Sequence, residues 1–328
     1  MSALSFQELA AASLAGEALS RRQCGLVLGC ADEDILALLD AAWRVRRRHF
    51  GTRVHVQVLS NAKSGLCPED CRYCSQSSVS TADIDRYPMI SPEELLAGAL
   101  GAKAAGARRF CMAISGSAPS EAELDRLCEA LGRIKAAAAG LSLCGSLGFL
   151  SVDQARRLKR AGLDRVNHNL NTSEGYYGQI CTTHGYRDRL DTIANCQAGG
   201  LEICSGGIVG QGESDEDVID MLLALRAIGP QAVPINFLVP IAGTPFAHRA
   251  GDLNPRKCLK VLCLARLLLP AAEIRASAGR EHHLRSLQPL ALYAADSIFV
   301  SGYLTTGGQS AEAAREMIRD LGFEIVTE

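Results

Sequence analysis

The feature that most constrains the fold is a regular change between short β-rich runs and longer amphipathic helices, which starts at Gly51. Candidate strands lie at 53–60, 108–115, 141–147, 164–171, 201–209, 232–239, 272–278 and 297–301. Candidate helices between them include Ser91–Ala105, Ser120–Ala138, Val152–Ala161, Ser214–Ile228, Pro255–Leu269 and His283–Ala294. Eight strand–helix alternations are what a closed (β/α)8 barrel requires, so the sequence predicts an α/β fold of the TIM type. A doubly wound open sheet is the competing fold, because the count alone does not exclude it.

The barrel is expected to occupy residues 51–305. A helical N-terminal extension at 1–50 precedes it, because Ser5–Ala15 and Asp32–His49 carry apolar residues at helical spacing, with Ser5 and Asp32 as N-caps. A C-terminal helical tail at 306–328 follows it and contains a helix at about Ser310–Leu321. The basic run Arg44–His49 is expected to be the solvated end of the second helix of the extension.

Composition excludes several classes of protein. The chain has 34 basic and 36 acidic residues, so no surplus charge favours binding to nucleic acid or to an anionic membrane. It starts without a basic-then-apolar leader and contains no apolar run of about 18 residues, which predicts a cytoplasmic protein that does not enter membranes. Its 13 cysteines are therefore expected to be reduced and to serve metal binding or packing rather than disulfides.

Three of these cysteines lie within eight residues, in Cys67-Pro-Glu-Asp-Cys71-Arg-Tyr-Cys74. Three thiolates on one short loop can each bind a different iron of a 4Fe–4S cluster, which leaves the fourth iron open to a small molecule. A closed zinc site would need a fourth ligand, and the residues that follow offer neither cysteine nor histidine. The triplet also follows the first predicted strand, and chemistry in a barrel gathers at the carboxyl ends of the strands.

Three further cysteines, Cys111, Cys144 and Cys204, fall on predicted strands, and Arg275 falls on another. If all four side chains point into the barrel, they could surround a second and deeper metal centre. From spacing alone the ordinary interpretation is the better one, because a cysteine on a strand is usually a small buried hydrophobe and an arginine is usually an ion-pair residue. The remaining cysteines show no ligand-like grouping and are interpreted as packing residues: Cys24, Cys30, Cys128, Cys181, Cys196, Cys258 and Cys263.

Two other patterns indicate a binding cavity. Asn167, Asn169 and Asn171 alternate, so on a strand they share one face, while His168 points the other way. Amides that face a barrel interior are costly unless they bind a ligand or each other; the alternative is a strand end in solvent. The glycines of 206–212 superficially resemble a phosphate loop, but no Lys-Ser/Thr follows and the glycine order is wrong, so close approach of the backbone to a bound molecule is the better interpretation.

The cysteine triplet, with the aromatic Tyr73 before its last cysteine, resembles the cluster loop of radical S-adenosylmethionine enzymes. The resemblance becomes specific in an ordered set of segments from about residue 45 to the C-terminus. These are LCPEDCRYCSQS, RFCMAISG, LCGSLGFLS, NHNLNTS, ICSGGIVGQGE, VPINFLVPIAGTP, IRASAGRE and YLTTGGQS. Together they resemble the biotin synthase family, in which a helical N-terminal extension is also typical.

This resemblance implies roles for individual residues. Cys67, Cys71 and Cys74 would bind the 4Fe–4S cluster, and Cys111, Cys144, Cys204 and Arg275 would hold a 2Fe–2S cluster whose bridging sulfide is the sulfur source. Around S-adenosylmethionine, Arg189 would pair with the methionyl carboxylate, Asn169 and Asn171 would hold the ribose, and Tyr73, Ile208 and Val239 would flank the adenine. Asn169 and Asn236 would contact dethiobiotin, and His168 would touch the cofactor. The family often carries aspartate where this chain has Asn171.

The implied activity is the insertion of sulfur between two saturated carbons of dethiobiotin to form biotin. Nonpolar C–H bonds offer no acidic proton, so we expect no acid–base residue and instead two 5′-deoxyadenosyl radicals from two S-adenosylmethionine molecules. Implied partners are a flavodoxin- or ferredoxin-type electron donor, the iron–sulfur assembly machinery and a second copy of the chain in a homodimer. The alternatives are a relative of the hydrogenase-maturation or methylornithine-synthase type, or a non-catalytic iron–sulfur or zinc sensor.

Overall fold

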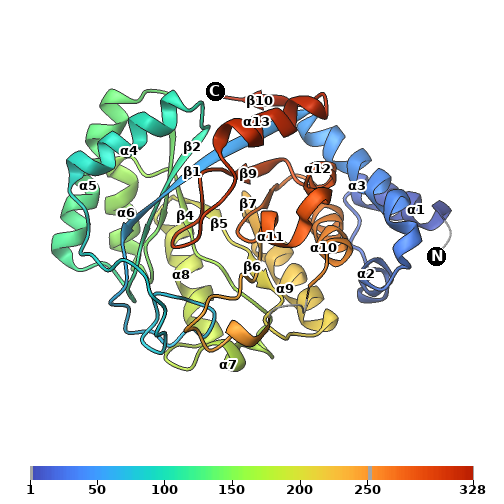
Figure 1. Cartoon of the computed structure of the whole chain (residues 1–328), viewed down its shortest axis with the longest axis horizontal. Helices are drawn as coiled ribbons and strands as arrows, with labels where there is room; N and C mark the ends of the chain where they lie inside the picture. Colours follow the sequence, from blue (N-terminus) through green and yellow to red (C-terminus); the bar gives the residue numbers. More distant parts are fainter. Residues whose placement is uncertain (1–2, 250–252, 328) are drawn as a thin grey trace.

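The strands close into a parallel barrel in the computed structural model, which describes residues 3–249 and 253–327 (Figure 1). The barrel strands are β1 (Arg53–Lys63), β2 (Arg109–Ile114), β3 (Ser142–Ser146), β4 (Arg165–Asn167), β5 (Glu202–Cys204), β6 (Gly207–Val209), β7 (Ala232–Phe237), β8 (Glu273–Ala276) and β9 (Ser297–Phe299). Each strand pairs with its neighbour, and β9 returns to pair with β1. Because β5 and β6 both pair with β7, they share one of the eight positions. The predicted closed barrel is confirmed, and the open sheet is excluded.

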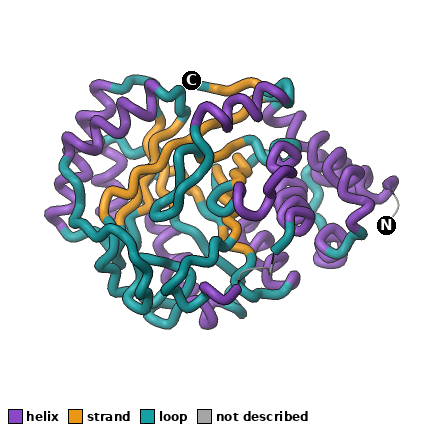
Figure 2. Tube along the Cα trace, viewed as in Figure 1, coloured by secondary structure: helices purple, strands orange, loops and turns teal. Residues whose placement is uncertain are grey.

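An outer layer of helices surrounds the strands (Figure 2). Its longer helices are α4 (Pro92–Ala104), α5 (Glu121–Ala137), α6 (Val152–Ala161), α8 (Tyr186–Ala198), α9 (Asp215–Ile228) and α10 (Pro255–Leu268). Capping boxes define where several of these helices begin. The side chains of Ser91, Ser120, Ser151 and Ser214 each accept a hydrogen bond from the backbone N–H three residues later. Short helical turns complete the layer at α7 (Tyr177–Ile180), Ala247–Arg249, α11 (Arg280–Leu284), Arg285–Leu287 and α12 (Gln288–Ala291).

The two ends of the chain pack on the same side of the barrel. Helices α1 (Ala3–Leu14), α2 (Arg21–Leu28) and α3 (Ile35–Phe50) cover α10, whose residues from Cys258 to Leu268 are all buried. Helix α13 (Ala311–Asp320) leads to β10 (Glu324–Val326), which pairs with the first residues of β1 and was not predicted. The ring of Phe323 stacks on Trp43 of α3 at 5.2 Å, so the C-terminal segment rests directly on the N-terminal helices.

Three details of the predicted extension are wrong. Helix α1 begins at Ala3, so Ser5 is not its N-cap. Asp32 opens a short 3₁₀ turn (Asp32–Asp34), and its carboxylate pairs with Lys260 at 2.9 Å and with Arg256 at 2.5 Å instead of capping a helix. Arg46, in the basic run, is completely buried and donates hydrogen bonds to the carbonyls of Ala295 and Arg53 at 3.1 and 2.8 Å. The run therefore forms part of the core at this position.

Three predicted elements are interrupted in the structure. The strand expected at 201–209 is divided into β5 and β6. The strand expected at 164–171 ends at Asn167, and the helix expected at 283–294 is divided into shorter turns between Arg280 and Ala291. The loops that follow the strands gather on one side of the barrel, at the lower side of the view in Figures 1 and 2. In the described part of the chain, no helix is both long enough and apolar enough to span a membrane.

Candidate active site

A cavity lies at the carboxyl ends of the barrel strands, and most of the predicted site residues line it. They come from the loop after β1, the segment after β4, helix α8 and strands β6 and β7. The predicted residues in its wall are Cys67, Cys71, Tyr73, Cys74, His168, Asn169, Asn171, Arg189, Ile208, Asn236 and Val239. Predicted residues from five separate sequence segments therefore meet at one place.

The cysteine loop follows β1 directly. The N–H of Cys74 donates to the carbonyl of Cys71 at 3.1 Å, and the N–H of Gly65 donates to Gln76 Oε1 at 2.9 Å, so local turns hold the loop closed. Burial raises the pKa of Cys67 and raises that of Cys74 to about 11. The three sulfurs do not all lie within 4.8 Å of one another. A single metal ion bound by all three thiols would require that spacing. Their spread over one loop fits a cluster in which each thiolate binds its own iron.

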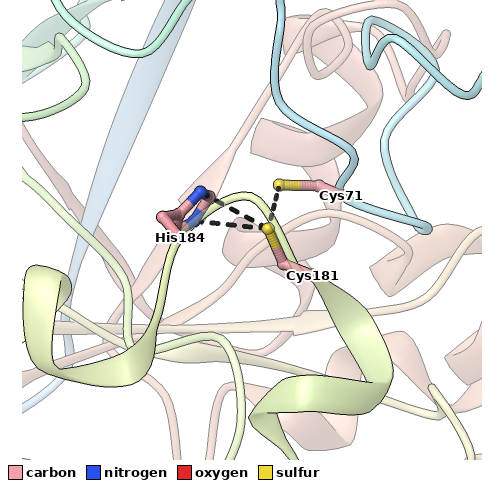
Figure 3. Close-up of side chains that lie close together, drawn as sticks. All are labelled: Cys71, Cys181 and His184. Carbon is pink, nitrogen blue, oxygen red and sulfur yellow. Dashed lines mark hydrogen bonds between the residues drawn. The ribbon is translucent and has the colours of Figure 1, made fainter.

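Cys181 and His184 lie beside this loop, which corrects the interpretation of Cys181 as a packing residue. Cys181 Sγ is 3.8 Å from Cys71 Sγ and 3.4 Å from His184 Nδ1 (Figure 3). The hydrogen bond from Cys71 lowers the pKa of Cys181 to about 5 and raises the pKa of Cys71. The next residues after the triplet offered no further ligand, but the fold brings two from 110 positions away.

Arg189 of α8 is a partly buried cation at the wall of the cavity. Its Nε donates to the Tyr177 hydroxyl at 2.6 Å, and a terminal N–H donates to His184 Nε2 at 2.9 Å. Across the described residues no carboxylate pairs with it. Burial disfavours its charge, yet the phenols of Tyr73 and Tyr177 outweigh burial and keep the pKa of Arg189 above its usual value. A partly buried guanidinium that lines a cavity without a protein carboxylate fits an anionic ligand, because an uncompensated charge shielded from water is costly.

The asparagine segment leaves the sheet after Asn167, so the predicted strand alternation does not hold. Asn171 has a left-handed backbone (φ 71°), and its side-chain N–H donates to the Tyr73 hydroxyl at 2.7 Å. Asn169 accepts hydrogen bonds from Asn167 and from the N–H of Gly206, both at 3.1 Å. His168 is buried in the same wall, and burial lowers its pKa well below the usual value. All four side chains face the cavity because the irregular backbone turns them toward it.

Asn236 and the glycine run hold neighbouring backbones together. The Asn236 amide donates to the carbonyl of Gly207 at 3.0 Å and accepts the N–H of Ala278 at 3.2 Å. A side-chain carbon on Gly206 would lie 1.9 Å from the carbonyl oxygen of Pro234, and one on Gly207 would lie 2.0 Å from Met221 Sδ. Gly206 and Gly207 are therefore required because an adjacent strand and an adjacent helix approach them closely. The prediction that these two glycines let the backbone approach a bound molecule is wrong.

Deeper in the barrel, the second predicted set also comes together. Cys111 and Cys144 are paired neighbours on β2 and β3, and both are buried. Arg275 of β8 directs a terminal N–H at the sulfur of Cys204 on β5, at 3.6 Å. Hydrogen bonds among the thiols raise the pKa of Cys144 to about 12 and lower that of Cys111. The three sulfurs and the guanidinium form one buried group inside the barrel.

The charges around this group carry a surplus of positive charge. Glu273 is buried and accepts hydrogen bonds from Arg109 at 3.1 Å, Arg165 at 3.0 Å and Arg275 at 2.5 Å. Burial opposes ionisation of Glu273, but the three guanidinium groups outweigh burial and hold its pKa well below the usual value. Within residues 3–249 and 253–327, only Arg165 of these three arginines has a second carboxylate, Glu202, at 2.7 Å. Three cations against two carboxylates fit an additional anionic occupant, such as a thiolate-bound cluster.

The two chambers are contiguous. A smaller space lined by Cys111, Cys144 and Arg275 shares Ser146, Asn167, Tyr303 and Leu304 with the wall of the main cavity. A molecule in the main cavity can therefore be close to both cysteine sets. No local sequence pattern indicated Glu273, Arg109, Arg165 or Tyr303, because their importance depends on strand register and loop paths and not on local spacing.

Comparisons with known proteins agree with this arrangement. The Radical SAM superfamily model matches residues 63–225, and the model of the Biotin and Thiamin Synthesis associated domain matches 234–324. Biotin synthases are 48% identical in Geobacillus kaustophilus, over 97% of this chain and 95% of that protein, and 47% identical in Bacillus subtilis, over 98% and 95%.

Among solved structures, methylornithine synthase superposes with a TM-score of 0.84 at 19% identity, over 97% of both chains. An FeFe-hydrogenase maturase from Carboxydothermus hydrogenoformans superposes with a TM-score of 0.81 at 19% identity, over 98% of this chain and 79% of that one. These two likenesses show a common fold, whereas the matches near 48% identity run through both cysteine sets and nearly the whole chain. The chain belongs to the biotin synthase family of the radical SAM superfamily.

Proposed function

We propose that this chain inserts sulfur between two saturated carbons of dethiobiotin and so forms biotin, using two S-adenosylmethionine molecules. The observation that carries the proposal is the pair of adjoining chambers, one lined by the cysteine loop and the other by Cys111, Cys144 and Arg275. A radical generated in one chamber and a sulfur source held in the other could act on one substrate between them. Family membership at 46–48% identity supports the same activity.

In the outer chamber, Cys67, Cys71 and Cys74 would hold a 4Fe–4S cluster. When bound, this cluster supplies the electron that cleaves S-adenosylmethionine to methionine and a 5′-deoxyadenosyl radical. Arg189 would bind the methionyl carboxylate through its free guanidinium edge, since its other contacts are the neutral groups Tyr177 and His184. This pairing orients the sulfonium group relative to the cysteine loop.

The remaining cavity residues would position the nucleoside and the substrate. Asn169 and Asn171 would bind the ribose hydroxyls, and Tyr73 holds Asn171 in place through the 2.7 Å hydrogen bond. Ile208 and Val239 would supply apolar contact to the adenine. Asn169 and Asn236 would bind the ureido ring of dethiobiotin, whose N–H and C=O groups match the amide donors and acceptors.

In the inner chamber, Cys111, Cys144, Cys204 and Arg275 would hold a 2Fe–2S cluster, which supplies a bridging sulfide for insertion. The surplus positive charge of Arg109, Arg165 and Arg275 would balance its negative charge. The C–H bonds to be broken are not acidic, so no side chain needs to act as an acid or base. The barrel walls would instead exclude water and competing reactants from the radical.

The same proposal includes a flavodoxin- or ferredoxin-type electron donor, cluster assembly by the iron–sulfur machinery, a homodimer and a cytoplasmic location. It also retains the division into an extension at 1–50, a barrel at 51–305 and a tail at 306–328. These follow from family membership and from the sequence.

An anaerobic assay of the reconstituted protein with dethiobiotin, S-adenosylmethionine and reductant tests the proposal. We expect biotin and 5′-deoxyadenosine as products, and roughly six irons per chain for two clusters. Production of 5′-deoxyadenosine with about four irons and no biotin would instead indicate a relative with one cluster. No 5′-deoxyadenosine at all would indicate a non-catalytic metal protein.

A further inference from the structure

We propose that the cluster-free chain binds one divalent transition-metal ion, of the zinc or iron(II) type, through Cys71, Cys181 and His184. The ligand atoms of these three residues all lie within 4.8 Å of one another (Figure 3). A Zn–S bond of about 2.3 Å in a tetrahedral site places two thiolate sulfurs about 3.8 Å apart. Cys71 Sγ and Cys181 Sγ are 3.8 Å apart in the structure. The two sulfurs therefore already have the spacing of ligands to a single ion.

The histidine is oriented as metal-binding histidines usually are. Its Nδ1 lies 2.6 Å from Glu69 Oε2, an arrangement in which the carboxylate accepts the Nδ1 proton and leaves Nε2 with a lone pair. Nε2 is 3.6 Å from Cys181 Sγ, close to the separation of about 3.6 Å expected for sulfur and nitrogen on one tetrahedral zinc ion. Arg189 now donates to Nε2 and would have to release it, while its hydrogen bond to Tyr177 remains.

The donor set selects the class of metal. Two thiolates and one imidazole suit zinc and iron(II) and do not suit magnesium or calcium, which take oxygen ligands. Asp70 Oδ1 accepts a hydrogen bond from Cys181 Sγ at 3.1 Å but does not belong to the group of ligand atoms within 4.8 Å of one another, so a water would complete four-fold coordination. Cys71 is buried, and the side chain of His184 is 6% exposed, so the site is shielded from solvent.

Because Cys71 belongs to both sites, the single ion and the 4Fe–4S cluster exclude each other. Thiolates on a cubane bind different irons and stand further apart than those on one ion, so Cys181 at 3.8 Å from Cys71 is not placed as a fourth cluster ligand. The mononuclear site is thus a property of the chain before cluster assembly. It stands or falls independently of the proposed sulfur insertion, because it needs neither S-adenosylmethionine nor dethiobiotin.

X-ray absorption of the full-length, cluster-free protein loaded anaerobically with one equivalent of Zn²⁺ tests the site. We expect two sulfur ligands at about 2.3 Å together with an imidazole nitrogen at about 2.0–2.1 Å. Three sulfurs without imidazole would show that zinc binds the Cys67–Cys74 loop alone and would overturn the proposal.

Co²⁺ titrations of matched variants test each ligand separately, with Co²⁺ binding followed by thiolate charge-transfer absorption. The double variant Cys67→Ala/Cys74→Ala should bind one Co²⁺ with wild-type affinity, whereas Cys181→Ser and His184→Gln should each bind at least tenfold more weakly. Glu69→Gln should weaken binding by about 10- to 100-fold through loss of histidine orientation. Loss of binding in the double variant, or wild-type affinity in both Cys181→Ser and His184→Gln, would refute the site. Far-UV circular dichroism of each variant shows that the chain remains folded.

Discussion

Replacing Arg189 by methionine tests whether the cavity is built to receive a carboxylate. The guanidinium is partly buried, and in the part of the chain that the structure describes it donates to Tyr177 and His184 and pairs with no carboxylate. Methionine has a similar length and no charge, so the variant removes the proposed anion-binding group and leaves most of the packing in place.

The expected loss of affinity for S-adenosylmethionine follows from the contacts that would be lost. A guanidinium–carboxylate pair makes two parallel hydrogen bonds, and hydrogen bonds to charged groups are worth about 1.5–3 kcal/mol each. A net loss of ~3 kcal/mol corresponds to roughly 150-fold weaker binding of S-adenosylmethionine. Arg189→Lys keeps the charge without the planar fork and should lose about tenfold. The free energy of unfolding should change by no more than ~2 kcal/mol, because the lost hydrogen bond to Tyr177 opposes the recovered cost of burying a charge.

Equilibrium binding of S-adenosylmethionine to the cluster-loaded, unreduced protein measures the affinity, and denaturant unfolding measures the stability. Arg46→Met is the control, because Arg46 is a fully buried arginine that donates to the carbonyls of Ala295 and Arg53 and does not line the cavity. It should lose ~2–4 kcal/mol of stability and keep its affinity for S-adenosylmethionine. The reasoning fails if Arg189→Met binds S-adenosylmethionine normally, or if it loses as much stability as Arg46→Met.

Four further predictions concern other parts of the molecule. Cys67→Ala should abolish 5′-deoxyadenosine formation, whereas Cys144→Ala should keep the first cluster and cofactor cleavage but stop biotin formation; biotin at the wild-type rate from Cys144→Ala would contradict the sulfur-source role. Asn171→Asp should keep the reaction, because aspartate tolerates the left-handed backbone and the Tyr73 hydroxyl can donate to it, and a lost activity in the product assay would contradict this geometry. Gly206→Ala should cost ~3 kcal/mol or more in denaturant unfolding, since its new carbon would lie 1.9 Å from the Pro234 oxygen, while Gly132→Ala, with open space in α5, should be neutral or stabilising. Burial raises the pKa of Asp296 to about 6, so the folded chain takes up a proton there that the unfolded chain does not. As the pH falls from 7 to about 4, the free energy of unfolding of the wild type should therefore rise by roughly 2–3 kcal/mol relative to that of Asp296→Asn. A difference between the two proteins that does not change with pH would show that Asp296 titrates normally.

Much of the fold was predictable from neighbours in the sequence. Five of the six predicted barrel helices were placed within one residue because serine caps and apolar spacing act over one or two turns, as at Ser120 and Ser214. The order of strands and helices predicted the closed barrel, and the cysteine loop and strand cysteines were located by their position relative to the strands. The roles assigned to these residues remain predictions until variants are measured.

Other features depended on contacts that no local pattern reports. The asparagine segment leaves the sheet after Asn167, and Asn171, with a left-handed backbone, pairs again through an isolated bridge to Gly207, so its alternation did not describe a strand. The glycines at 206 and 207 are required by Pro234 and Met221, which approach from other elements.

The sequence by itself determined the barrel and the two sets of cysteines, because caps, hydrophobic periodicity and loop spacing operate between residues a few positions apart. Only the tertiary structure placed Cys181 and His184 against Cys71, and Arg109 and Arg165 against Glu273. Those contacts join residues more than 100 positions apart, and strand register and loop paths set them through packing of the whole chain.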